Sequence, residues 1–124
     1  MLEAYSLNVT AAANSNVPFN STSLIKGCTV THPSPDTINL NKCGVYMVSV
    51  DASAAASTTL QLKKNGVLQP QAQSTGLSPS FTTLVQVQDN NCNCNPCAEP
   101  CVIQIVNTTA TTLTNCNITV TKIV

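Results

Sequence analysis

The sequence predicts an all-β protein, a sandwich or jelly roll of about ten antiparallel strands. Three observations carry this prediction. Short stretches alternate between apolar and polar residues, gaps of moderate length containing Pro, Gly, Asn or Asp separate them, and Thr and Val are abundant. The two Ala-rich patches, 11–13 and 52–56, lack apolar residues at helical spacing, so we expect no helix. Many short strands spaced in this way are typical of sandwiches and jelly rolls.

We expect nine candidate strands, favoured by alternation or by β-branched residues. In chain order they are Tyr5–Val9, Thr29–Thr31, Thr37–Leu40, Val45–Ala52, Thr58–Lys63, Val67–Gln71, Phe81–Gln88, Val102–Asn107 and Asn117–Ile123. The alternation is clearest where Leu60 and Leu62 face away from Thr59, Gln61 and Lys63. The Asn65-Gly66 pair that follows predicts a tight hairpin, with Gly66 supplying a positive φ.

Alternation continues in the second half of the chain. Phe81, Thr83, Val85 and Val87 share one face of their strand, Ile103 and Ile105 share one face of the next, and Ile118 and Val120 do so in the last. The expected connections are 33–36, 65–66, 74–79, 89–100 and 108–115. No fixed-period repeat is present, so we predict one sandwich.

The strand after Gly44 differs from the others because it is apolar on both faces. We place Tyr46, Val48 and Val50 in one layer, and Val45 and Met47 in the other. In an antiparallel protein this small, a doubly apolar strand indicates that a second surface is covered by another subunit. These five residues are therefore the predicted core and subunit interface.

Composition limits the possible functions. The chain has 124 residues, 8% of them charged, and a formal net charge of zero; all five basic residues are lysines. Without arginine or a basic patch we expect no nucleic-acid binding. The start, 1–5, resembles neither a signal peptide nor a membrane span, so we expect assembly in a cytoplasm and no membrane partner. We divide the chain into 1–16, an N-terminal arm and first strand that could act as an anchor, and a jelly-roll domain, 17–124.

Seven cysteines are many for a chain of this length, and four of them form a cluster: Cys92, Cys94, Cys97 and Cys101. Four thiolates within ten residues can hold one tetrahedral zinc ion, which would be structural. Disulfides are the second possibility, and free thiols, which suit Cys28 and Cys116 best, are the third. We expect Cys43 to lie nearer the cluster than Cys116, which would open the last strand at the opposite end.

No catalytic motif is present, so we predict that the protein is not an enzyme. His32 is the only histidine, and no nucleophile elbow accompanies it. The acidic residues are scattered singly, as expected of turn or solvated positions: Glu3, Asp36, Asp51, Asp89 and Glu99. No bound cofactor other than the candidate zinc is expected.

The order of several short motifs resembles one family. The motifs are Asn16–Asn20, Ile38–Leu40, Gly44–Val48, Leu60–Gly66 and Asn117–Ile123. This order is similar to the tumour necrosis factor / complement globular-head superfamily, and more closely to its bacterial and phage branch, which includes the C-terminal domain of the Bacillus collagen-like exosporium glycoprotein. The resemblance implies a ten-strand jelly roll that forms a tight trimer, with the central strand packed between the sandwich and the threefold axis.

The same resemblance implies a non-enzymatic role. We expect a trimeric phage virion protein, either a capsid decoration or a head fibre, that binds a capsid or other surface-layer protein. The alternatives are a carbohydrate- or receptor-binding head that uses the cysteine-rich loop, and a spore or cell-surface component of a Gram-positive bacterium. The collagen-like stalk of the family is absent, since the chain has only four glycines.

Overall fold

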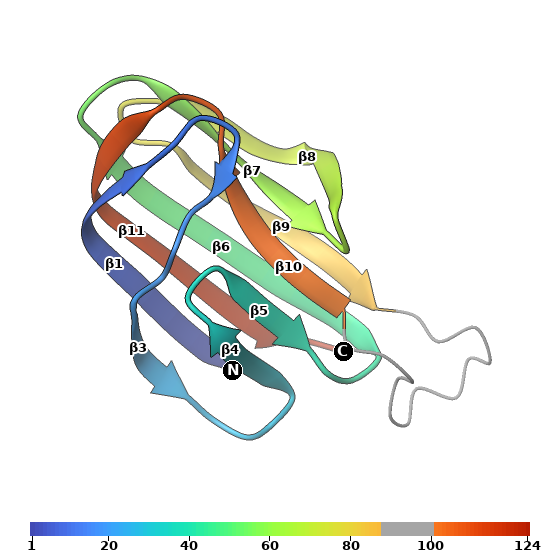
Figure 1. Cartoon of the computed structure of the whole chain (residues 1–124). Coiled ribbons are helices and arrows are strands. Elements are labelled where there is room, and N and C mark those ends of the chain that lie inside the picture. Colours follow the sequence, from blue (N-terminus) through green and yellow to red (C-terminus); the bar gives the residue numbers. More distant parts are fainter. Residues whose placement is uncertain (88–100) are drawn as a thin grey trace.

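The computed structural model describes residues 1–87 and 101–124, and within them the chain is built of β-strands (Figure 1). The strands are β1 (Leu2–Ala11), β2 (Ser15–Asn16), β3 (Ser21–Ile25), β4 (Val30–Ser34), β5 (Thr37–Leu40), β6 (Gly44–Ala54), β7 (Thr58–Lys64), β8 (Val67–Gly76), β9 (Ser80–Val87), β10 (Cys101–Asn107) and β11 (Thr111–Lys122). Within these ranges no helix has the length and apolarity that a membrane span requires.

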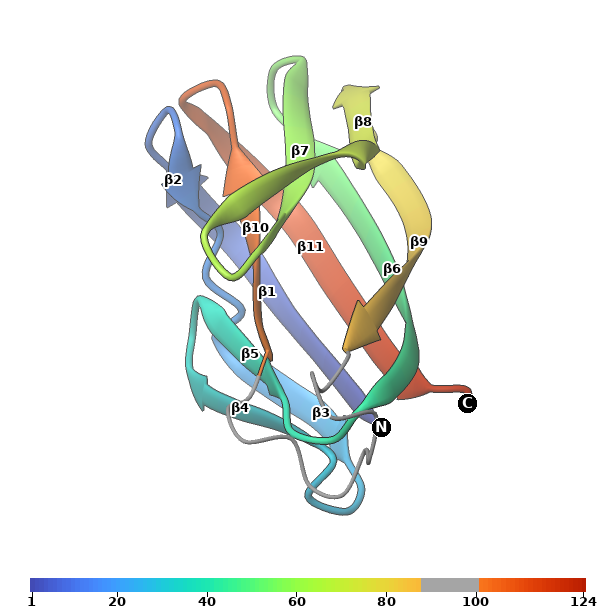
Figure 2. The ribbon, with the colours of Figure 1, turned by 90° about the vertical axis from the view of Figure 1, so that its right-hand side faces the viewer.

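Two antiparallel sheets face each other as two layers (Figure 2). One sheet has the order β3-β1-β11-β6-β9 and the other β4-β5-β10-β7-β8, with the short β2 paired to β10. Most connections between consecutive strands from β5 onward cross from one sheet to the other, which is the topology of a jelly roll. The predicted fold class, an all-β jelly roll, is confirmed.

The core lies between the two sheets and is made by the alternating residues of each strand. Its largest fully buried side chains include Leu2, Tyr46, Leu60, Ile103 and Ile118. Burying one such aliphatic side chain contributes roughly 1.5–3 kcal/mol relative to leaving it in water. Polar residues alternate with them on the outer faces, as the period of two predicts.

The predicted hairpin at Asn65-Gly66 joins β7 to β8. Both residues have positive φ, 50° and 83°, as the twist of a two-residue hairpin requires. The backbone N–H of Asn65 donates to the Val102 carbonyl, and the Asn65 side-chain oxygen accepts from the Val102 N–H, both at 2.8 Å. Asn65 thus continues the hydrogen bonding of β10 beyond the end of β7.

Several predicted boundaries were wrong. The strand Ser21–Ile25 was missed, and β4 includes Pro33 and Ser34, which we had placed in a connection. The predicted connections 74–79 and 108–115 are also too long, because β8 continues to Gly76 and β11 begins at Thr111. Ser21–Ile25 is largely exposed and is ordered by its pairing with β1, whereas the first part of β11 pairs with β6 and also buries Leu113.

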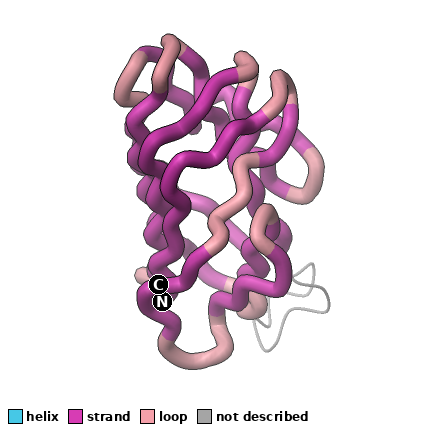
Figure 3. The backbone as a smooth tube through the Cα atoms, turned by 60° about the vertical axis from the view of Figure 1, so that its left-hand side comes forward, coloured by secondary structure: helices cyan, strands magenta, loops and turns pink. Residues whose placement is uncertain are grey.

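The two termini lie at the same end of the sandwich (Figure 1 and Figure 3). Residues 1–16, which we set apart as an arm and first strand, form β1 and β2 inside the sheets, and Leu2 and Ala4 are fully buried. An anchoring role for this segment stays a prediction.

A buried polar cluster lies around Asn107, the last residue of β10. Asn107 is fully buried; its side-chain oxygen accepts from the Thr58 hydroxyl, and its amide nitrogen donates to the carbonyls of Ala11 and Thr109. The cluster therefore ties β1, β7 and β10 together where the two sheets meet.

Candidate assembly interface

The two faces of β6 have different surroundings. Tyr46, Val48 and Val50 are buried in the core, whereas Val45 is half-buried and Met47 is 39% exposed on the outer face of the sheet. Within one chain, then, only one apolar face of β6 is covered. The role of these residues in a subunit interface stays a prediction.

Exposed apolar residues gather at the end of this outer face where β6 begins. Met47 pairs with Leu84 of β9, which is 60% exposed, and with Thr121 of β11. Val45 lies one pair further along, hydrogen-bonded through its backbone to Ile123, which is 49% exposed. Side chains of β6 and β9, with Ile123 just after β11, thus form an apolar end of the face.

Toward the middle, the same face is covered by hydroxyls and amides. Ser49 and Thr82 share a hydrogen bond of 2.9 Å across β6 and β9. In the four strands β1, β11, β6 and β9 the charged residues are Glu3, Asp51 and Lys122, and the Lys122 ammonium group turns to the Val124 carbonyl at 2.8 Å. Because so few charges would lose water, packing this face against another protein surface has a small desolvation cost.

Gly44 sets the position of β6 against the C-terminal residues. Its φ is +142°, and a Cβ built there would collide with the Val124 carbonyl oxygen and lie 2.6 Å from Cε of Lys122. The residue at 44 must therefore be glycine for the last residues of the chain to lie against Val45.

Tyr46 combines a buried ring with a satisfied hydroxyl. The hydroxyl donates to the Lys42 carbonyl at 2.6 Å and accepts from the Lys42 N–H at 3.3 Å. Burial raises the pKa of Tyr46, and the bond to Lys42 only partly opposes this. The neutral Tyr46 side chain therefore fixes the turn between β5 and β6 by hydrogen bonds to its backbone.

The cysteines are in different states. Cys43 is disulfide-bonded, and Cys28, Cys101 and Cys116 are free thiols. Cys28 is exposed, so it is free as expected but does not serve as a small core residue, whereas Cys116 does. Burial raises the pKa of Cys116 to about 12, and the nearby Asp51 carboxylate adds to this. The Cys116 thiol is thus protonated and unreactive.

Of the candidate zinc ligands, Cys92, Cys94 and Cys97 lie outside the described residues. Cys101 opens β10 and is buried in the core; burial raises the pKa of its thiol, and Lys64 opposes this in part. In residues 1–87 and 101–124 no three His, Cys, Asp or Glu side chains form a metal-binding group. A structural zinc site stays a prediction.

The structure places Cys43 and Cys116 as follows. Leu40, three residues before Cys43, pairs with Cys101, the described member of the cluster. Cys116 lies inside β11, opposite Ala52 and Ser6, so the prediction that it opens the last strand was wrong.

The remaining polar groups are engaged in structural contacts. Both ring nitrogens of His32 are hydrogen-bonded, to the Thr22 hydroxyl at 3.0 Å and the Pro35 carbonyl at 3.1 Å. Burial would raise the pKa of Asp36, but hydrogen bonds, including those from Asn16 and Ser34, lower it overall. These contacts fix the turn between β4 and β5 and tie it to β3.

One interface residue was not singled out from the sequence. Leu84 lies on the same face of its strand as Thr82 and Gln86, opposite the face that the sequence analysis described. A single leucine on an otherwise polar face was the available signal, and it became informative only when β9 was found beside β6.

Comparison with known proteins identifies the fold. No family model and no curated protein sequence matches the chain. Among solved structures, it is similar to the globular domain of a zebrafish complement 1qA protein, with a TM-score of 0.77 and 13% identity over 99% of this chain and 96% of that one. Murine APRIL (TM-score 0.65, 11% identity, 98% of each chain) and rabbit GITRL (0.61, 11%, 100% and 95%) are also similar. The chain therefore has the jelly-roll fold of complement globular heads and tumour necrosis factor family ligands.

Proposed function

We propose that this chain is a non-enzymatic structural module that assembles as a homotrimer through the outer face of β1, β11, β6 and β9. The observation that carries the proposal is the apolar end of that face, where Met47 and Leu84 are exposed in a single chain and Val45 is half-buried. Water-exposed apolar residues grouped across neighbouring strands favour a protein contact. The fold supports this use, because the resemblance noted from the sequence implies a trimer built on the same central strand.

We further propose that the trimer decorates a virion, as a phage capsid decoration or head-fibre protein located in the assembled particle. Three features support this role. The chain is weakly charged, its sheet faces are covered by hydroxyls and amides, and the motif order resembles the bacterial and phage branch. A binding head and a spore or cell-surface component are the alternatives.

The trimer is tested by light scattering of the purified protein at micromolar concentration. We expect three times the 13.0 kDa chain mass. Met47→Glu should shift the distribution toward the monomer, because it adds a carboxylate to the apolar end of the face. Leu68→Glu is the matched control, since Leu68 is an exposed leucine on β8 of the other sheet.

Two results would overturn the proposal. A wild-type mass near 13.0 kDa would show that the protein is a monomer. Equal loss of assembly in Met47→Glu and Leu68→Glu would show that the outer face of β6 is not the interface. The virion role is tested separately by the gene's neighbourhood. Capsid, portal or terminase genes support it, and spore-coat genes with sporulation-linked expression contradict it.

A further inference from the structure

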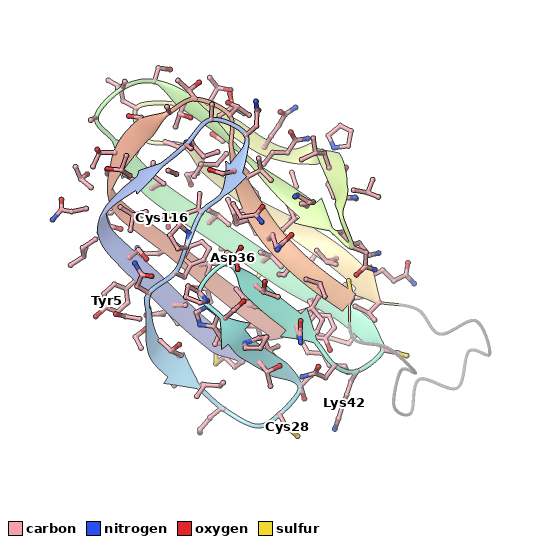
Figure 4. The ribbon with its side chains drawn as sticks, viewed as in Figure 1. Tyr5, Cys28, Asp36, Lys42 and Cys116 are labelled. Atoms are coloured by element: carbon pink, nitrogen blue, oxygen red, sulfur yellow. The ribbon has the colours of Figure 1, made fainter. Side chains whose placement is uncertain are left out.

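All five lysines of the chain lie at one end of the sandwich, although they are far apart in sequence: Lys26, Lys42, Lys63, Lys64 and Lys122. This is the end where β6 begins and both termini lie. Lys42 comes two residues before Gly44, and the Lys122 side chain passes over Gly44. Figure 4 shows Lys42 at this end, with Asp36 further along the sandwich.

The other lysines are placed there by their contacts. The Lys64 ammonium group donates to the Gln86 carbonyl at 2.6 Å, and Gln86 pairs with Val45. Lys63 precedes Lys64 on β7. The Lys26 N–H donates to the Met1 carbonyl at 2.9 Å, at the start of β1. We call this set of five residues the lysine end.

The acidic residues do not balance this charge. Of the three described acids, only Glu3 is near the lysine end. Asp51 is seven residues beyond Gly44 along β6, about 23 Å at roughly 3.3 Å per residue. Asp36 bonds to Asn16 on the strand that pairs with the far part of β10. Even if Asp89 and Glu99 are counted here, five lysines against three acids leave a positive excess.

The ammonium groups are available for a partner. Within the described part of the chain, Lys64 and Lys122 donate to main-chain oxygens, and none of the five pairs with an Asp or Glu carboxylate. Exposed apolar side chains stand among them: Val124 is 76% exposed, and Met1, Ile25 and Ile123 are each at least 43% exposed. The surface is therefore both basic and apolar.

We propose that the lysine end is a docking surface for an acidic protein surface. Lysines act as point charges that pair with carboxylates, and the apolar residues between them fit apolar side chains of a protein partner. The chain has no arginine to form the paired hydrogen bonds by which phosphates are commonly bound, which disfavours nucleic acid. The inference deepens the proposed function and rests on it, since it names how the module attaches to a larger assembly.

The test measures binding of the full chain to three anionic probes at 50 and 300 mM NaCl. The probes are fluorescent poly-L-glutamate, vesicles of phosphatidylserine and phosphatidylcholine, and duplex DNA. The variant is Lys26→Gln/Lys42→Gln/Lys63→Gln, which keeps the two lysines that bond to the backbone. The matched control, Ser57→Asp/Ser78→Asp/Ala110→Asp, makes the same charge change at exposed positions in the connections of the opposite end.

We expect poly-L-glutamate to bind best, with binding weakened by salt and about tenfold weaker in the lysine variant, which loses three salt-screened charge pairs. The control should bind like the wild type, and circular dichroism should show all three proteins folded. No binding to poly-L-glutamate, equal loss in both variants, or tighter lysine-dependent binding to vesicles or DNA would overturn the proposal. Light scattering separates the outcomes, because a monomer that binds through the lysine end refutes the trimer and leaves the docking surface standing.

Discussion

Replacing Gly44 by alanine should destabilise the fold because two separate costs fall on one position. The positive φ of +142° is strained for a residue with a Cβ, at roughly 1–3 kcal/mol. The Cβ would also collide with the Val124 carbonyl oxygen and with the Lys122 side chain, and overpacking adds about 1–3 kcal/mol. Together these costs predict a loss of about 3 kcal/mol in the free energy of unfolding. For a chain of this length the melting temperature should fall by about 10 °C.

Gly27→Ala is the control that isolates the close approach. Gly27 has a positive φ of +72°, but a Cβ added there would meet no atom within 4 Å. Only the backbone cost applies there, about 1 kcal/mol. Thermal unfolding followed by circular dichroism at one fixed protein concentration compares the two variants, since assembly makes melting concentration-dependent. If both variants lose the same stability, the packing of the C-terminal residues over Gly44 does not constrain the fold and the reasoning fails.

Three further predictions concern buried groups. Asn107→Ala should lower the free energy of unfolding in urea by about 2–4 kcal/mol, because it leaves the buried Thr58 hydroxyl without its partner. The control Asn115→Ala, at an exposed position of β11, should change the free energy of unfolding by less than about 0.5 kcal/mol. Equal effects of the two substitutions would contradict the stabilising role of the polar cluster around Asn107. The pKa of Cys116 is about 12 in the folded chain and 9.0 in the unfolded chain. The stabilisation of the fold by the neutral thiol is therefore complete below pH 9, and it falls by about 1.4 kcal/mol per pH unit between pH 9 and 12. Urea unfolding between pH 9 and 12 should show that the free energy of unfolding falls less steeply with pH in Cys116→Val than in the wild type. Equal slopes in the two proteins would contradict the assignment of this pH dependence to Cys116. Thiol titration in denaturant without reductant should find at most five of the seven cysteines, because the Cys43 disulfide uses two, and six or seven would contradict that bond.

The strands that the sequence predicted best are those whose alternation reports burial directly. In β7, Leu60 and Leu62 face the core and their neighbours face outward, and the Asn-Gly pair that follows permits one hairpin geometry. Each of these features depends on residues close together in the chain. Local pattern therefore suffices for such an element.

The missed segments owe their structure to distant partners. β3, Ser21–Ile25, is largely exposed and has no apolar alternation; it is a strand because it pairs with β1. The first part of β11 is rich in Thr and Asn and is ordered between β1 and β6. A sequence pattern records side-chain burial and carries little information about backbone pairing to strands far along the chain.

The candidate interface could also be predicted only in part, because local pattern does not reveal which distant strands lie beside it. Two apolar faces on 45–50 could be recognised from the sequence, but their alternation is symmetrical and does not say which face meets the core. The sheet order decides this, by placing Tyr46 over the core and Met47 beside Leu84. The lysine end was likewise hidden, because its members gather only when alternating strand directions bring 26, 42, 63–64 and 122 to one end.

The two proposed surfaces meet at the start of β6, and the symmetry of a trimer determines how its lysine ends are arranged. The apolar end of the interface face and the lysine end share the region around Val45. In a cyclic trimer all copies point the same way along the axis, so the three lysine ends would lie on one side of the assembly. A surface whose single contacts are weak would then be presented three times, and simultaneous contacts strengthen attachment far more than any one of them. Assembly through one face of the sheet would therefore convert a modest charge excess on each chain into a strong docking surface.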